Sequence, residues 1–196
     1  AATLYKENIV KYLIVPEETE VPTGLDQELI IIRLPLTASY APTAETTAIF
    51  ESLGFGEMVK AFGYKEDGED DSYAGTWDDL KFKTLIKNKI DLVTIPSSAL
   101  PMDKKSAEDM KDGLFQRTDV PEYKVESSYD TKTAKEKLDE ATEKIAMYGM
   151  AAFVDRADQE KTDIAGYEWI KAYGALLGCE DKAFELFEKA AAEYEK

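Results

Sequence analysis

Short apolar segments alternate along this chain with segments of helical periodicity, and this alternation limits the possible folds more than any other feature of the sequence. The predicted strands occupy residues 12–15, 29–36, 58–64, 90–95 and 151–154. Strands that alternate with helices are typical of parallel sheets, in which each connection crosses over through a helix. The sequence therefore predicts an α/β fold with a mostly parallel sheet.

The clearest single unit is a strand followed by a helix. Residues 29–36 are apolar or β-branched at successive positions, which is typical of a strand buried on both faces, and Pro35 marks where it leaves the sheet. Thr43 is a suitable N-cap for a helix over residues 44–53, and Gly54 is a suitable left-handed stop. We expect one β-loop-α unit here.

Four further helices follow from the spacing of apolar residues. The longest apolar stripe recurs at intervals of three and four and ends before Gly149; it consists of Ala134, Leu138, Ala141, Ile145 and Tyr148. The other helices are predicted over residues 77–88, from Thr162 or Asp163 to Gly178, and over residues 184–194. The chain thus continues as α/β to its end.

Two stretches lack this order. Residues 66–71 are acidic and contain glycine, which predicts a solvated loop, and they do not have the Asp-x-Asp-x-Asp-Gly pattern of a calcium loop. Residues 101–129 lose clear periodicity, so we interpret them as an irregular insertion with one short helix near residues 106–111. Neither stretch predicts a metal site.

The charge of the chain excludes two classes of partner. The 196 residues include 40 acidic and 24 basic side chains, which give a formal net charge of −16. Such a chain repels the phosphates of nucleic acids and anionic lipids. No segment approaches the roughly 20 apolar residues of a transmembrane helix, so we expect no stable membrane insertion.

The chain contains no histidine and a single cysteine, Cys179. Histidine is the usual acid-base residue near neutral pH and is essential to Ser-His-Asp triads and to HExxH zinc sites. One cysteine allows no internal disulfide and no cysteine-rich metal site. Most common hydrolase chemistries are therefore excluded, and we expect a protein that is not an enzyme.

Three segments resemble one protein family, and they occur in that family's order. Residues 28–55, ELIIIRLPLTASYAPTAETTAIFESLGF, are similar to the opening of solute-binding proteins of ABC importers, of the helical-backbone type that binds iron-siderophores and cobalamin. Residues 90–97, IDLVTIPS, resemble a later strand of these proteins. Residues 148–156, YGMAAFVDR, and 167–178, YEWIKAYGALLG, resemble the end of their N-terminal lobe.

The resemblance implies both an architecture and a function. Residues 1–178 would form a Rossmann-like, three-layer N-terminal lobe, and residues 179–196 would begin the backbone helix that joins it to a second lobe. The function implied is that of a bacterial extracytoplasmic protein, periplasmic or anchored as a lipoprotein on the outer face of the cytoplasmic membrane. It would capture a chelated-iron or cobalamin-like ligand in a cleft between the lobes and deliver it to the ABC permease subunits. No other cofactor is expected.

The candidate ligand residues follow from the sheet. Ligands of open α/β sheets lie beyond the carboxyl ends of the strands, so the residues just after each predicted strand are the candidates. They are Ser39, Tyr40, Thr76, Trp77, Ser97, Ser98, Asp155 and Arg156. Tyr40 and Trp77 could stack on a planar ligand, and Arg156 could pair with a carboxylate. The alternative is structural: Trp77 anchors the core, and Arg156 pairs with Asp155 or Asp158.

Two departures from the family concern the ligand. Gly166 occupies a position where relatives often have an arginine, and the missing histidines distinguish the chain from manganese and zinc receptors of similar architecture. A chelated or organic ligand is therefore favoured over a bare ion. Acidic side chains such as Glu66, Glu69 and Asp70 are candidates for docking onto the permease.

Two other functional classes remain open from the sequence. One is a small flavodoxin-like enzyme that uses paired carboxylates such as Asp78 and Asp79 or Asp155 and Asp158, although the adjacent Asp78 and Asp79 would point in different directions on a helix. The other is an acidic interaction or scaffold domain whose last helix is its docking surface.

Overall fold

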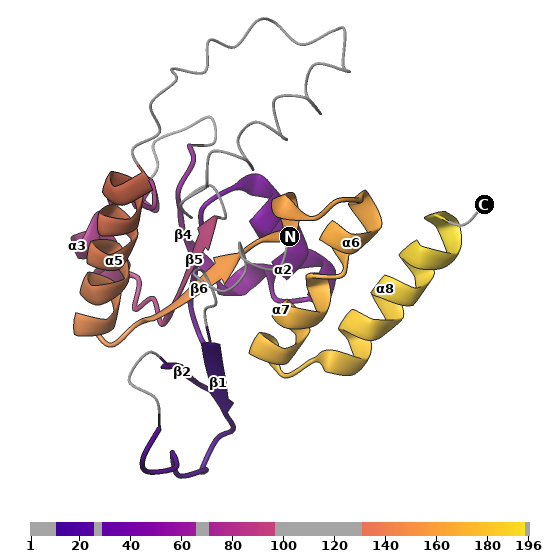
Figure 1. Ribbon diagram of the computed structural model, residues 1–196, viewed down its shortest axis with the longest axis horizontal. Helices are drawn as coiled ribbons and strands as arrows, with labels where there is room; N and C mark the ends of the chain where they lie inside the picture. Colours follow the sequence, from indigo (N-terminus) through magenta and orange to yellow (C-terminus); the bar gives the residue numbers. More distant parts are fainter. Residues whose placement is uncertain (1–10, 26–28, 66–70, 97–130, 195–196) are drawn as a thin grey trace, which may run out of the picture.

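The computed structural model describes residues 11–25, 29–65, 71–96 and 131–194, and its centre is a four-stranded parallel sheet (Figure 1). The strands are β3 (Ser39–Ala41), β4 (Val59–Phe62), β5 (Leu92–Pro96) and β6 (Ala151–Asp155), in the spatial order β4-β3-β5-β6. The β5–β6 ladder is regular, and Leu92 pairs with Ala151 at its start. Because all four strands are parallel, their carboxyl ends meet at one edge of the sheet.

Helices cover both faces of this sheet. On one face lie α3 (Phe82–Lys87) and α5 (Thr131–Met147), whose Leu85 and Ile145 are fully buried. On the other face lie α2 (Ala44–Leu53), α7 (Ile170–Leu177) and α8 (Glu180–Tyr194), and this face has its own core cluster. Figure 1 shows the two groups on opposite sides of the strands. The predicted three-layer α/β fold with a mostly parallel sheet is confirmed.

The helix boundaries set by caps also agree with the sequence. Thr43 is the N-cap of α2, and its hydroxyl oxygen accepts a hydrogen bond from the Thr46 amide. Gly54 ends the same helix with φ of 91°, and Gly178 ends α7 with φ of 65°. Both values lie in the left-handed region, which glycine adopts without steric cost.

The prediction of a doubly buried strand over residues 29–36 is wrong in its length and in the sheet that it joins. The structure forms only β2 (Leu29–Arg33), which pairs in parallel with β1 (Lys11–Val15) in a separate two-stranded ribbon. Ile32 is buried, but the side chain of Ile31 is 40% exposed, so β2 is not buried on both faces. The strand that precedes α2 is instead β3, which is three residues long.

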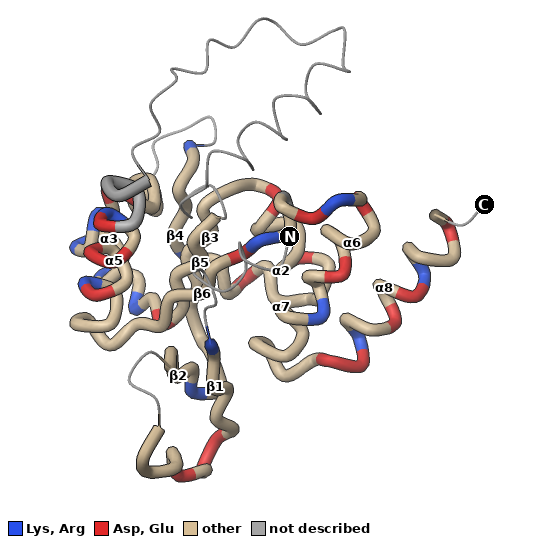
Figure 2. The backbone as a smooth tube through the Cα atoms, viewed as in Figure 1, with Lys and Arg blue, Asp and Glu red and all other residues tan. Residues whose placement is uncertain are grey.

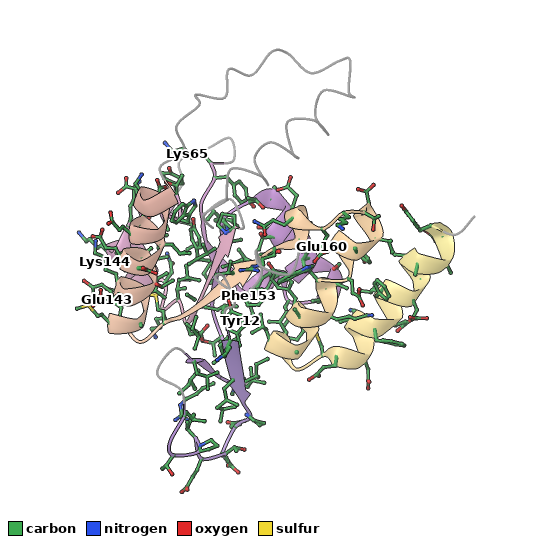
Figure 3. The ribbon with its side chains drawn as sticks, in the orientation of Figure 1. Tyr12, Lys65, Glu143, Lys144, Phe153 and Glu160 are labelled. Atoms are coloured by element: carbon green, nitrogen blue, oxygen red, sulfur yellow. The ribbon has the colours of Figure 1, made fainter. Side chains whose placement is uncertain are left out.

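A tyrosine of β1 attaches the ribbon to the main sheet. The Tyr12 hydroxyl accepts a 2.8 Å hydrogen bond from the Val154 amide of β6, and its ring lies 5.4 Å from that of Phe153 (Figure 3). Burial raises the pKa of Tyr12 to about 12. The ribbon is therefore held at the edge strand of the sheet.

Two predicted helices are shorter than expected. The helix predicted over residues 77–88 begins only at Phe82, because the Lys81 amide donates to the Ala74 carbonyl and closes a loop before it. The helix predicted from residues 162–163 to 177 is divided into α6 (Asp163–Tyr167) and α7. Around Trp169 several backbone hydrogen bonds join residues three apart rather than four apart, as in a 3-10 helix, and this tightens the turn between α6 and α7.

Several predictions fall outside the described residues: the insertion at residues 101–129, its short helix, and most of the acidic loop. In the part of the chain that is described, no helix combines the length and the apolar character that crossing a membrane requires.

Candidate functional site

The strand order defines one position on the sheet where a ligand site is expected. From β3 the chain goes first to β4 on one side and later to β5 on the other, so the order reverses between β3 and β5. In open α/β sheets ligands bind at such a switch point, outside the carboxyl ends of the strands. The residues that follow β3 begin with Pro42 and Thr43, whereas those that follow β5 lie outside the described residues.

Four hydroxyl side chains lie beyond the ends of β3 and β4; we call Thr43, Thr46, Thr47 and Tyr64 the carboxyl-edge cluster. The Thr43 and Thr46 hydroxyl oxygens are 3.3 Å apart, and those of Thr47 and Tyr64 are 2.9 Å apart. Thr46 is buried, and the other three are half-buried. The cluster presents neutral hydrogen-bonding groups next to the switch point.

Close backbone packing brings the two strand ends together. The Gly63 amide donates a 2.8 Å hydrogen bond to the Ala41 carbonyl, which joins the end of β4 to the end of β3. A methyl group on Gly63 would collide with the Pro42 carbonyl and the Tyr40 hydroxyl. Glycine is therefore required here for Tyr64 to lie next to α2.

Two charged residues lie near this edge, Lys65 after β4 and Glu45 after β3. Lys65 directly follows Tyr64 and is exposed, and Figure 3 shows it at the end of the chain segment that leaves β4. Its ammonium nitrogen is 5.0 Å from the centre of the Tyr73 ring. Glu45 lies in the first turn of α2. Hydrogen bonds to its carboxylate from the Glu45 backbone amide and from the Thr43 side chain hold the pKa of Glu45 below its usual range. The Glu45 carboxylate thus has hydrogen-bond partners within the chain.

Ser39 and Tyr40 were expected after a strand, and the structure places them within one. Both lie in β3 and are fully buried, and the Tyr40 hydroxyl donates a 2.9 Å hydrogen bond to the Gly75 carbonyl. Burial also raises the pKa of Tyr40 well above its ordinary value. The predicted loop position is therefore wrong, because the central strand of the sheet is this short segment and not residues 29–36.

Trp77 lies in the turn before α3, half-buried against the core on the side of α3 and α5. The turn is fixed by a 2.8 Å hydrogen bond from the Thr76 hydroxyl to Asp78. Asp78 also lies 3.9 Å from the ammonium of Lys137 in α5. The position agrees with the anchoring alternative for Trp77, and its contact with a ligand stays a prediction.

Asp155 is the last residue of β6 and has a structural role. One carboxylate oxygen accepts a 2.8 Å bond from the Ala157 amide, and the other accepts a 2.5 Å bond from the Tyr173 hydroxyl. Burial and the neighbouring Asp155 charge raise the pKa of Tyr173 well above its ordinary value. Asp155 therefore fixes α7 to the sheet.

The structure does not bring all the predicted residues together. Tyr40 and Trp77 belong to the face of α3 and α5, whereas Arg156 follows β6, which is separated from β3 by β5. Arg156 is half-buried at the start of a short 3-10 helix, η3 (Ala157–Gln159). Ser97 and Ser98 lie outside the described residues.

From the sequence, Thr43 is predicted only as a cap, and Thr47 and Tyr64 are not among the candidate ligand residues. Tyr64 was available from the sequence, since it closes the predicted strand over residues 58–64. Thr47 becomes visible only when α2 is placed, because it lies one helical turn after Thr43 and faces Tyr64.

The chain was compared with protein families, with curated proteins and with solved structures. No protein family and no curated protein matches the chain. Among solved structures, the chain is similar to the periplasmic vitamin B12 binding protein BtuF of Vibrio cholerae, with a TM-score of 0.41 and 12% sequence identity. The match covers 81% of this chain and 49% of that one, so this chain spans about half the length of that protein.

Proposed function

We propose that this chain is a ligand-binding lobe of an extracytoplasmic solute-binding protein that serves an ABC importer. The observation that carries the proposal is the carboxyl-edge cluster, which lies beyond the carboxyl ends of β3 and β4; β3 is one of the two strands between which the strand order reverses. The three segments that resemble the family include β3, β5 and β6. The resemblance therefore falls on the strands that form the switch point.

The proposed ligand is a chelated-iron or cobalamin-like molecule. Hydroxyl groups such as those of Thr47 and Tyr64 suit a large ligand with many hydrogen-bond acceptors, and exposed Lys65 adds a positive charge. The described residues hold no group of three or more acidic or cysteine side chains that could bind a bare metal ion. Recognition of an already chelated metal is the chemistry that these groups support best.

The proposal includes a second wall for the cleft, an ABC permease as partner, and a location outside the cytoplasmic membrane, periplasmic or lipid-anchored. Residues 1–178 would supply one lobe, and residues 179–196 would begin the helix that joins it to the other. A single lobe covers only one side of a ligand, and closure of two lobes is what buries it. Binding by this chain alone is therefore expected to be weak.

Nuclear magnetic resonance tests both the ligand class and the position of the site. The ¹⁵N-labelled chain is titrated with cyanocobalamin and with the gallium(III) complex of desferrioxamine, a diamagnetic substitute for the iron chelate. We expect shifts of the amides of Thr43, Thr47, Gly63 and Tyr64 for one of the two ligands, with a dissociation constant on the order of 100 μM or weaker.

A pair of variants provides the control. Tyr64→Phe removes one hydroxyl from the cluster and should weaken binding at least about threefold, whereas Tyr148→Phe, at the opposite edge of the sheet, should not change it. Submicromolar binding by the chain alone would contradict a half-cleft. Shifts confined to other parts of the chain, or no shift with either ligand, would contradict the proposed site and ligand class.

A further inference from the structure

A small groove lies among the elements that follow β6, and none of its lining residues belongs to the carboxyl-edge cluster. It has a volume of 280 Å³ and is lined by Glu160, Ala165, Glu168, Trp169 and Ala172. The lining comes from the segment after η3, from α6 and from the start of α7. Figure 3 places Glu160 beside α6. A water molecule takes about 30 Å³ of liquid, so the groove has room for a group of several heavy atoms.

The apolar part of the groove consists of an indole and two methyl groups. Trp169 is half-buried, and its ring also lies 6.3 Å from that of Phe153 in the sheet, which fixes its position. Its indole N–H donates a 3.1 Å hydrogen bond to the Glu160 carboxylate. A carboxylate is thereby held at the rim of an aromatic surface.

The two carboxylates of the groove differ in charge balance. Glu168 is 2.9 Å from the ammonium of Lys171 and is neutralised by it. Glu160 instead accepts a hydrogen bond from the neutral indole of Trp169. The Glu160 carboxylate is exposed at the groove and supplies a negative charge there, on a chain whose net charge is −16.

This combination matches one class of ligand. Alkylammonium groups bind to tryptophan faces through cation–π attraction, and their methyl or methylene groups favour an apolar lining. A divalent metal requires several oxygen ligands, which alanine and tryptophan side chains cannot supply. Lys171 shows the same chemistry beside the groove, since its ammonium lies between Glu168 and the Phe187 ring, 3.6 Å from the ring centre.

We propose that the groove formed by Glu160, Trp169 and their neighbours binds an alkylammonium group, with Trp169 as its aromatic surface and Glu160 as its counter-charge. The site is separate from the carboxyl-edge cluster, and the inference does not depend on the proposed transport function. The group belongs either to a free quaternary amine or to a methylated lysine side chain of a partner protein.

The chain contains two tryptophans, so their indole N–H resonances report on the groove with an internal reference. The ¹⁵N-labelled protein is titrated with choline, with Nα-acetyl-Nε-trimethyllysine amide, and with 3,3-dimethylbutan-1-ol, the neutral isostere of choline. We expect a saturable shift of the Trp169 resonance with the cations and not with the neutral alcohol, while that of Trp77 stays in place. The Trp169→Phe variant assigns the two signals.

Charge variants complete the test. Glu160→Gln should weaken choline binding at least about threefold, whereas Glu17→Gln, which removes the same charge from an exposed loop, should not. Saturation with both cations identifies a free quaternary amine as a sufficient ligand, and saturation with the lysine derivative alone identifies a partner side chain. Equal shifts with the neutral alcohol, or no saturable shift with either cation, would overturn the proposal.

Discussion

Tyr173 connects three elements through one side chain. Its ring meets Phe50 of α2 at 5.7 Å and Phe153 of β6 at 5.3 Å, both in edge-to-face geometry. Its hydroxyl donates a 2.5 Å hydrogen bond to Asp155 at the end of β6. Because the residue is fully buried, both the ring and the hydroxyl contribute to stability.

Replacing Tyr173 by phenylalanine separates these contributions. The ring contacts stay, but Asp155 loses a donor in a partly buried position, and we expect the free energy of unfolding to fall by about 1–3 kcal/mol. Urea denaturation measures this difference. Tyr167→Phe is the matched control, because Tyr167 is 37% exposed. Equal, small effects of both variants would show that the Tyr173 hydroxyl contributes nothing beyond its ring.

The position of Tyr40 could not be predicted from the sequence. The sequence predicts Tyr40 as an aromatic side chain after a strand, whereas the structure places it inside the central strand with its hydroxyl hydrogen-bonded to the Gly75 carbonyl. The three-residue segment Ser-Tyr-Ala carries no apolar periodicity of its own. Its strand conformation depends on pairing with β4 and β5, which lie far away in the sequence.

Helix ends, in contrast, depend on neighbouring residues, and for this reason the caps of α2 were predicted correctly. Thr43 accepts from the Thr46 amide, and Gly54 supplies the left-handed turn. Neither feature needs a distant partner. The apolar stretch at residues 29–36 predicts a strand of the main sheet, whereas β2 belongs to the separate ribbon. The reason is that β-branched composition favours a strand but does not specify which sheet the strand joins.

The N-cap of α2 stabilises the helix through the Thr43 hydroxyl. Thr43→Ala removes the acceptor for the Thr46 amide and should lower the free energy of unfolding by about 1 kcal/mol, whereas Thr43→Ser, which keeps the hydroxyl, should lower it by less. Thermal unfolding followed by circular dichroism measures both. A serine variant as unstable as the alanine variant would indicate that the threonine methyl, and not the cap, is important.

Acidic and basic residues are spread along the helices on both sides of the sheet (Figure 2). Three tyrosines join separate parts of the fold through their hydroxyls. Tyr12 joins the two-stranded ribbon to β6, Tyr40 joins β3 to the loop before α3, and Tyr173 joins α7 to β6. Burial is the largest cause of a raised pKa for all three phenols, so each resists ionisation in the folded chain.

These phenols predict a loss of stability in alkali. The ordinary pKa of a tyrosine is 10.0, and that of Tyr12 is raised to about 12. Between these values the unfolded chain has lost a proton that the folded chain keeps, so stability is complete below pH 10 and falls as the pH rises towards 12. Each such tyrosine contributes about 1.4 kcal/mol per pH unit in this range.

Urea denaturation between about pH 9 and about pH 11.5 tests this, together with the absorbance of the phenolate. Of the eleven tyrosines, we expect those three to ionise only as the chain unfolds. Tyr12→Phe should reduce the slope of the unfolding free energy against pH by about 1.4 kcal/mol per pH unit, because the variant has one buried phenol fewer. A stability that stays level from pH 10 to about pH 11.5 would mean that these hydroxyls ionise in the folded chain as freely as in water, and that they do not join the parts of the fold described here.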